Sequence, residues 1–325
     1  MIGKPNIQTH ECIFQLYLEH RIHGMCTAGV HNLLLNDSIG SPPLVREKSH
    51  NGLNLIKDIP DYLNFGMQWP SKMKSMRIPQ YYGYLIKLKG HSGIDGFIGA
   101  QLSKRNIKNL RAKKKKFEQL GSVEYRVMTG PLEDKVYEDA FDAFQRLLKE
   151  RFDKKKILNR YLMDWKGLYV RAHARLTEGR ALLFSILLDG KPVGMALDYI
   201  LGSTVFSHIQ TYDQEFSKYN IGDLMMYFQL EWSFKHGMAI LDLSKGENAF
   251  KEKWCNHRYR LYHEVGYPKG SPTMAVWAWG LAMKYYLIQK LRDIGLLGKI
   301  VNVDQLLYKR HGRDITDQIQ AKGAL

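Results

Sequence analysis

The clearest hydrophobic pattern of the chain lies between residues 181 and 211. Three apolar segments follow one another there, separated by Asp189-Gly190 and Gly202-Ser203. Asp-Gly between apolar segments is a strong local signal for a β-hairpin, because both residues tolerate the positive φ of a tight hairpin turn. The pattern therefore predicts three consecutive strands, at Ala181–Leu188, Pro192–Ile200 and Thr204–Thr211.

A loop, a helix and a further strand follow these strands. The loop starts at Tyr212 and reaches Gly222, and a helical pattern continues from there to Gly237. A short apolar segment, Ala239–Ser244, is predicted to form the last strand. The first turn of a helix has unpaired N–H groups and the positive end of the helix dipole, so this loop is suited to binding an anion. The order of these elements, together with this turn, indicates a coenzyme site.

The rest of the chain also mixes strands and helices, which indicates the α/β class in a mixed (α+β) arrangement. Residues 1–80 contain only short apolar runs, among which Leu33–Leu35 is a candidate strand. We expect two domains, 1–178 and 179–325, because 325 residues are long for one domain. Further predictions are strands at 81–88 and 122–128, helices at 94–117, 136–152 and 159–177, and a Trp- and Tyr-rich helix from residue 273, followed by a basic segment up to residue 310.

The composition favours an anionic partner. There are 48 Lys and Arg against 32 Asp and Glu, a formal net charge of +16. Nucleic acid, a phosphorylated coenzyme and an anionic membrane surface all fit this charge. Three widely spaced cysteines imply no disulfide framework. This use of cysteine fits a reducing, cytoplasmic location. We also expect no secretion signal, no membrane-spanning segment and no metal site.

Two blocks of residues resemble a known family. The first is Tyr212-Asp213-x-x-Phe216-x-x-Tyr219-x-x-Gly222-x-Leu224, and the second runs from Leu241 to Trp254. Their spacing resembles that of the BioF2-like, or CelD/BcsL-type, acetyltransferases of the Gcn5-related N-acetyltransferase (GNAT) superfamily. Asn220-Ile221 departs from the family, which usually has Pro before the glycine, and Phe250 stands where Tyr is common. The resemblance implies a GNAT fold, here as two tandem GNAT-like halves with a mixed central sheet.

The same resemblance implies a binding site for acetyl-CoA or another acyl-CoA. The third strand would diverge from strand 239–244, and pantetheine would pair with its edge, with the amide near Gln210 as an oxyanion donor. Backbone N–H groups at the helix N-terminus would hold the pyrophosphate, and Lys218 would add charge. The coenzyme-binding residues are then Ile209, Gln210, Thr211, Lys218, Tyr219, Ile221, Gly222, Asp223 and Leu224.

Four residues are candidates for catalysis, and each has an alternative structural role. His208 titrates near neutrality but is equally suited to a core position in its strand. Asp213 opens the loop and fits a turn or cap equally well. Asp242 lies in an apolar strand, where a carboxylate is costly without a partner, so it is either catalytic or paired with a nearby cation. Tyr212 is the fourth candidate.

The acceptor is expected to be an amine on a sugar, a nucleotide sugar or a small metabolite, positioned by Lys245, Glu247 and Lys251. A FemABX-like transferase that uses aminoacyl-tRNA is the alternative enzyme, and the basic charge suits it. A degenerate acyltransferase fold without activity is the third hypothesis, with membrane contact through residues 273–325. The run Lys113–Lys116 either is a solvated helix face or attracts an anionic acceptor.

Overall fold

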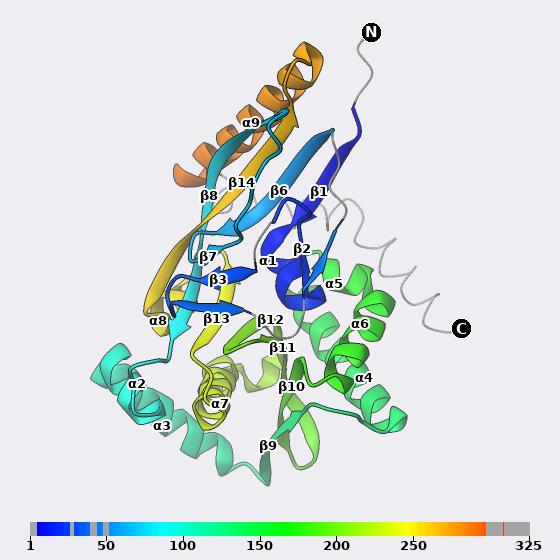
Figure 1. The fold of residues 1–325 in the computed structure, drawn as a ribbon. Helices are drawn as coiled ribbons and strands as arrows, with labels where there is room; N and C mark the ends of the chain where they lie inside the picture. The colour runs from blue at the N-terminus through cyan, green and yellow to red at the C-terminus, as the bar shows by residue number, and fades with distance from the viewer. Residues whose placement is uncertain (1–4, 27–28, 40–43, 48–51, 297–307, 309–325) are drawn as a thin grey trace. The chain divides into compact units, whose positions relative to one another are not determined.

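The protein is described here by a computed structural model, which covers residues 5–26, 29–39, 44–47, 52–296 and 308 (Figure 1). Its contacts divide it into two compact units. The first unit comprises the described residues of 1–87, 201–206 and 239–297, and the second comprises those of 88–200, 207–238 and 298–325. Both mix helices with strands, so the predicted α/β class is confirmed. None of the helices in the described ranges is long and apolar enough to cross a membrane.

The division does not fall at residue 178, because the first unit takes strands from both ends of the chain. Its sheet has the order β1-β6-β14-β8-β13, so β8 (Met73–Lys87) lies between β14 (His257–Pro268) and β13 (Ile240–Lys245). The predicted pair of tandem halves, 1–178 and 179–325, is not tested by this division and stays a prediction. The other strands of this sheet are β1 (Ile7–Glu11) and β6 (Leu53–Pro60).

Short elements complete the first unit. The segment Leu33–Leu35, a candidate strand, is instead the turn between β3 (Val30–Asn32) and β4 (Asp37–Ile39). The reason is local, because Oδ1 of Asn32 accepts hydrogen bonds from the N–H groups of Leu34 and Leu35. The remaining elements are α1 (Cys12–Phe14), a π-helix (Gln15–Glu19), β2 (Arg21–Ile22), β5 (Val45–Arg46), β7 (Leu63–Asn64), α8 (Ala249–Trp254) and α9 (Pro272–Asp293).

The second unit contains the predicted three-strand pattern. The strands β10 (Ala181–Leu188), β11 (Lys191–Leu201) and β12 (Thr204–Tyr212) lie next to one another, as predicted. Asp189 and Gly190 both have positive φ, at 49° and 76°, which is the geometry expected of the Asp-Gly hairpin. β9 (Val123–Met128) pairs with the other side of β10. Seven consecutive residues of β10 are buried, and both α6 (Trp165–Thr177) and α7 (Ile221–Lys235) contact this strand.

Two predicted helices are each interrupted. The helix predicted at 94–117 is divided into α2 (Ile94–Gln101) and α3 (Lys104–Glu118). Ser103 caps α3, because its side chain accepts a hydrogen bond from the N–H of Asn106. The helix predicted at 159–177 is divided at Asp164 into α5 (Arg160–Met163) and α6. The helix predicted at 136–152 is α4 (Asp134–Lys155). The basic segment predicted up to residue 310 lies, apart from residue 308, beyond the described residues.

Candidate active site

The loop between β12 and α7 is built by two local devices. Asp213 caps the 3₁₀ helix Gln214–Tyr219, because its Oδ1 accepts a 2.9 Å hydrogen bond from the N–H of Glu215. Asn220 then adopts the left-handed conformation, with φ of 57°, which turns the chain into α7. The loop therefore ends in a helix N-terminus, as predicted, and Asp213 has the cap role that was its structural alternative.

The first turn of α7 offers fewer N–H groups than expected. The N–H groups of Asp223 and Leu224 both donate to the carbonyl oxygen of Asn220, at 2.8 and 3.1 Å. Those of Ile221 and Gly222 have no partner in the described part of the chain. A Cβ on Gly194 of β11 would lie 2.8 Å from the Ile221 side chain, so this glycine allows α7 to begin close to the sheet. The helix end thus has two N–H groups without a partner among the described residues, that of the buried Ile221 and that of the partly exposed Gly222.

β12 pairs with β13 over only three residues. The parallel register joins Thr204, Val205 and Phe206 to Ile240, Leu241 and Asp242, although β12 continues to Tyr212. From Ser207 onward, β12 has no pairing with β13 in the described structure. The backbone of this part of β12 is therefore not engaged by a parallel neighbour, which is the condition for adding an extended ligand to a strand.

Arg151 contacts this strand and carries no signal in the sequence. Its Nη1 donates a 2.7 Å hydrogen bond to the carbonyl oxygen of Gln210, and its guanidinium lies 4.7 Å from the ring centroid of Tyr212. Desolvation lowers the pKa of Arg151. The side chain of Gln210 in turn donates to the carbonyl oxygen of Gly222, at 3.2 Å. Gln210 and Gly222, both predicted to bind coenzyme, are thus brought together.

His208 has the features of a core histidine. Its ring lies between those of Tyr161 and Tyr199, at centroid distances of 4.9 and 5.5 Å. Desolvation lowers the pKa of His208 to about 3, so the ring is neutral at physiological pH. A base whose conjugate acid is this strong takes up a proton poorly near pH 7. The arrangement favours the structural alternative over the catalytic one.

Asp242 is fully buried in the first unit and is bound by two tyrosines. The Tyr62 hydroxyl donates to Oδ2 at 2.6 Å, and the Tyr259 hydroxyl donates to Oδ1 at 2.9 Å. The N–H of Ser244 donates to Oδ1 at 2.7 Å. Burial raises the pKa of Asp242 to about 6, and these donors oppose the increase. Two hydroxyls and a backbone N–H therefore bind this carboxylate directly, whereas the sequence offered either a catalytic role or pairing with a cation.

Two lysines, Lys245 and Lys251, follow Asp242 in the chain and make hydrogen bonds near the end of β13. Lys251 donates to the carbonyl oxygens of Ser244 and Lys245, at 3.2 and 2.6 Å, and desolvation lowers the pKa of Lys251 to about 8. The ammonium of Lys245 donates to Oδ2 of the buried Asp58 at 2.6 Å. Glu247 is exposed. The structure thus brings Lys245, Lys251 and Asp242 together at the end of β13, and Asp58 joins them from β6.

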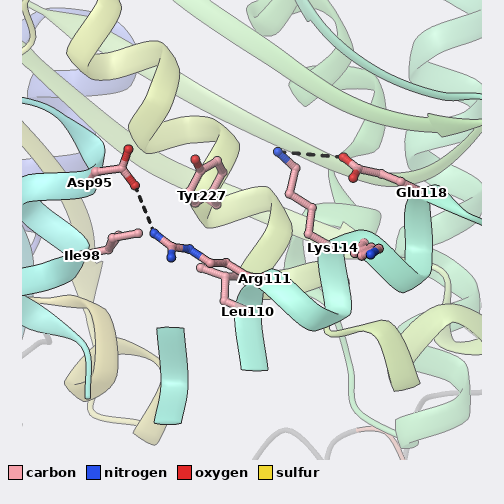
Figure 2. Close-up of a pocket in the computed structure, with 8 residues that line it drawn as sticks. Asp95, Ile98, Leu110, Arg111, Lys114, Glu118 and Tyr227 are labelled. Carbon is pink, nitrogen blue, oxygen red and sulfur yellow. Dashed lines mark ion pairs between the residues drawn. The ribbon is translucent and has the colours of Figure 1, made fainter. Parts of the chain in front are cut away.

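The basic run on α3 is divided between internal contacts and solvent. Lys113 Nζ donates to the carbonyl oxygen of Lys218 at 2.5 Å, which ties α3 to the loop before α7. Lys114 pairs with Glu118 at 3.8 Å and lies over the ring of Tyr227, and all three residues line one pocket (Figure 2). Lys115 and Lys116 are exposed. Only the second half of the run is the solvated face that one interpretation predicted.

A family match covers the elements on which the site was predicted. Residues 104–252 match the family model described as acetyltransferase (GNAT) domain, which is less than half of the 325 residues but includes β12, α7 and β13. This part of the chain is therefore similar to a GNAT-type acetyltransferase domain, and the predicted GNAT fold is confirmed for it. The finer assignment to the BioF2-like subtype stays a prediction.

Solved structures show weaker similarity. The chain is similar to L-PGS from Bacillus licheniformis, with 13% identity over 73% of this chain and 72% of that chain and a TM-score of 0.45. It is similar to FemX, with 14% identity over 61% and 64% and a TM-score of 0.45. It is also similar to the PaiA N-acetyltransferase from Thermoplasma acidophilum in complex with coenzyme A, with 15% identity over 36% and 75% and a TM-score of 0.29. These low scores decide neither the acyl donor nor the acceptor. No curated protein matches the chain significantly.

Proposed function

We propose that the protein is an acyl-CoA-dependent N-acyltransferase that transfers an acyl group, other than an aminoacyl group, to an amine. The observation that carries this proposal is the match of residues 104–252 to the GNAT acetyltransferase domain. The local geometry supports it, because this segment includes a strand that leaves its parallel neighbour after three residues and a helix start with two unpaired N–H groups.

The coenzyme would lie along β12 and at the start of α7. The N–H groups of Ile221 and Gly222 fit a pyrophosphate, since they are unpaired and lie at the positive end of the helix dipole. Lys218 is exposed and adds positive charge next to them. The backbone of Ile209 to Thr211 would pair with the pantetheine amides. Bound acyl-CoA supplies an activated thioester, which an amine attacks directly.

Asp213 is the base that we propose for the amine proton. It stands at the end of β12 and is half-buried, whereas Asp242 is fully buried and already accepts hydrogen bonds from three donors. Oδ1 of Asp213 holds the loop, and Oδ2 has no partner among the described residues. A carboxylate held this way reaches a nearby ammonium directly or through one water.

The acceptor that we propose is an amine on a sugar, a nucleotide sugar or a small metabolite. This part rests on the family resemblance, which also suggests polysaccharide biosynthesis. The net charge of +16 is consistent with an acceptor that carries phosphate.

Aminoacyl-tRNA is the second candidate donor, and the surface of α3 favours it. Its exposed cations Lys104, Arg105 and Lys108 precede the exposed Lys115 and Lys116. A tRNA held by such a surface would bind with steep salt dependence, because neutralising phosphates releases counterions. Acetyl-CoA has few charges, so the salt dependence of its binding would be shallow.

Calorimetric titration with acetyl-CoA, CoA and ATP at moderate salt tests the proposal. We expect micromolar binding of acetyl-CoA that Gly222→Leu weakens at least about tenfold, by crowding the anion site. Gly99→Leu is the matched control, because a Cβ on this exposed helical glycine meets nothing within 4 Å. Equal, salt-sensitive binding of all three ligands, or none, would contradict the proposal and favour tRNA or a module without activity.

A further inference from the structure

Helix α9 is apolar on two opposite faces. One face packs against the sheet of the first unit, where Ala278 and Ala282 are buried among Leu53, Leu55 and Val265. In Figure 1, α9 (orange) lies along β14 and β8, which it contacts. This face of the helix therefore belongs to the core of the first unit.

The opposite face carries a stripe of exposed apolar side chains. Val276, Trp279, Met283 and Leu287 recur at intervals of three and four residues, so they lie on one side of the helix. Their exposed fractions are 68, 61, 50 and 52%. A helix packed on a sheet normally presents polar residues to solvent, and a contiguous apolar surface marks an interaction site. The α9 stripe is defined as Val276, Trp279, Met283, Tyr286, Leu287 and Ile294.

The charge around the α9 stripe is positive. No acidic residue occurs between Glu264 and Asp293, whereas Lys284 and Lys290 lie within the helix. The ammonium of Lys290 lies 5.6 Å from the ring centroid of the exposed Tyr286. Long lysine side chains beside apolar and aromatic groups place the charge above a buried apolar layer.

We propose that the α9 stripe docks the protein on an anionic membrane surface. The helix would lie in the plane of the surface, with Trp279 and Met283 inserted below the headgroups and the lysines at the lipid phosphates. Charge decides between possible occupants, because an apolar partner surface explains the stripe but not why residues 265–292, which carry most of it, include lysines and no acidic residue. This inference is independent of the proposed acyltransferase activity.

Vesicle co-sedimentation of the full chain tests the proposal. We expect binding to vesicles of phosphatidylcholine with about 30% phosphatidylglycerol, and at least about tenfold less binding to phosphatidylcholine alone. Binding to the anionic vesicles should weaken as salt is raised, because the lysine contribution is screened. Absence of binding to the anionic vesicles at low salt would overturn the proposal.

Two double variants test the apolar part. Trp279→Ser/Met283→Ser should lower binding to anionic vesicles at least about tenfold, because it removes the inserted side chains. Met163→Ser/Val170→Ser is the matched control, since both residues are exposed apolar side chains of the second unit. Circular dichroism confirms that each variant is folded. Equal loss in both variants, or none in the first, would overturn the assignment to α9.

A second pair of variants tests the charge. Lys284→Gln/Lys290→Gln and Lys104→Gln/Lys108→Gln lower the net charge equally, but only the first pair lies on α9. Only the first should weaken binding to anionic vesicles. Sedimentation velocity addresses the remaining occupant. A wild-type dimer that Trp279→Ser/Met283→Ser converts to a monomer, without vesicle binding by either, would replace the membrane by a second copy of the chain.

Discussion

The Tyr62 hydroxyl donates a 2.6 Å hydrogen bond to Oδ2 of Asp242, which lies 180 residues later in the chain. Since Tyr62 uses its only proton in this bond, the 3.0 Å contact between the Tyr17 and Tyr62 hydroxyls must be donated by Tyr17. A chain of hydroxyls therefore ends on one buried carboxylate. This arrangement stabilises an ionised group that burial alone would exclude from the core.

Replacing Tyr62 by Phe should destabilise the first unit. The change removes one donor from Asp242 and leaves the Tyr17 hydroxyl without its acceptor, so we expect a loss of about 2–3 kcal/mol in the free energy of unfolding. Urea denaturation at pH 7.5 measures this loss. Tyr286→Phe is the control, because this tyrosine is exposed, and it should change the stability by less than about 0.5 kcal/mol. Equal stability of both variants would show that the bond contributes little.

Gly83 provides the space for Tyr259. A Cβ at this position of β8 would overlap the ring and the hydroxyl of Tyr259, which donates to Asp242. Gly83→Ala should therefore cost at least about 3 kcal/mol in stability, or prevent folding, because neither the strand nor the buried ring has room to move. Gly99→Ala, in an exposed helix, should be neutral or slightly stabilising. A wild-type melting temperature for Gly83→Ala would contradict this packing.

Asp198 should make the stability depend on pH. Burial raises the pKa of Asp198 to about 7, and Gln229 donates a 2.7 Å hydrogen bond to it. Between about pH 4 and 7, Asp198 keeps its proton in the folded protein but has released it in the unfolded chain. The free energy of unfolding therefore falls as pH rises through this range. Asp198→Asn removes this effect while keeping an acceptor for Gln229.

The stability of Asp198→Asn relative to wild type should therefore rise by about 2–4 kcal/mol between pH 4 and pH 8. Urea titrations of both proteins over this range measure the difference, in which the histidines common to both cancel. A difference that stays constant with pH would mean that Asp198 has an ordinary pKa in the folded protein.

Asp213 can be tested with a residue that keeps the cap and removes the base. Asp213→Ser retains a side-chain acceptor for the N–H of Glu215, so its stability should stay within about 0.5 kcal/mol of wild type, whereas Asp213→Ala should lose about 1 kcal/mol. If Asp213 is the base, both variants should release CoA at least about 100-fold more slowly with a panel of amines. Wild-type turnover by Asp213→Ser would leave Asp213 with the cap role alone.

The sequence predicted the elements whose signals are local. The Asp189-Gly190 turn and the alternation of apolar segments located β10 correctly, residue for residue. Few elements of the first 80 residues could be predicted, because their strands pair with distant parts of the chain. Leu53–Pro60, for example, pairs with a strand some 200 residues further along the chain. Such pairings leave no local pattern. Leu33–Leu35 was taken for a strand for a different reason, because its apolar run hides the turn that the Asn32 side chain holds.

The candidate site was predicted in part. Asp242 was singled out correctly as a buried carboxylate that needs a partner, but no local signal pointed to Tyr62 or Tyr259, which come from other parts of the chain. Arg151 was missed because a basic residue near the end of a charged helix resembles a solvated one. The loop before Gly222 was predicted from its spacing, although the pairing of the Asp223 and Leu224 N–H groups with Asn220 could not be read from it.

Hydrogen–deuterium exchange with and without acetyl-CoA would locate the coenzyme on the protein. We expect the coenzyme to slow exchange in peptides that cover Ser207–Tyr212 and the start of α7 at Ile221 and Gly222. Protection should be absent from these peptides in Gly222→Leu and retained in Gly99→Leu. Protection confined to other segments, or none at a saturating concentration of acetyl-CoA, would contradict the placement of the coenzyme on β12 and α7.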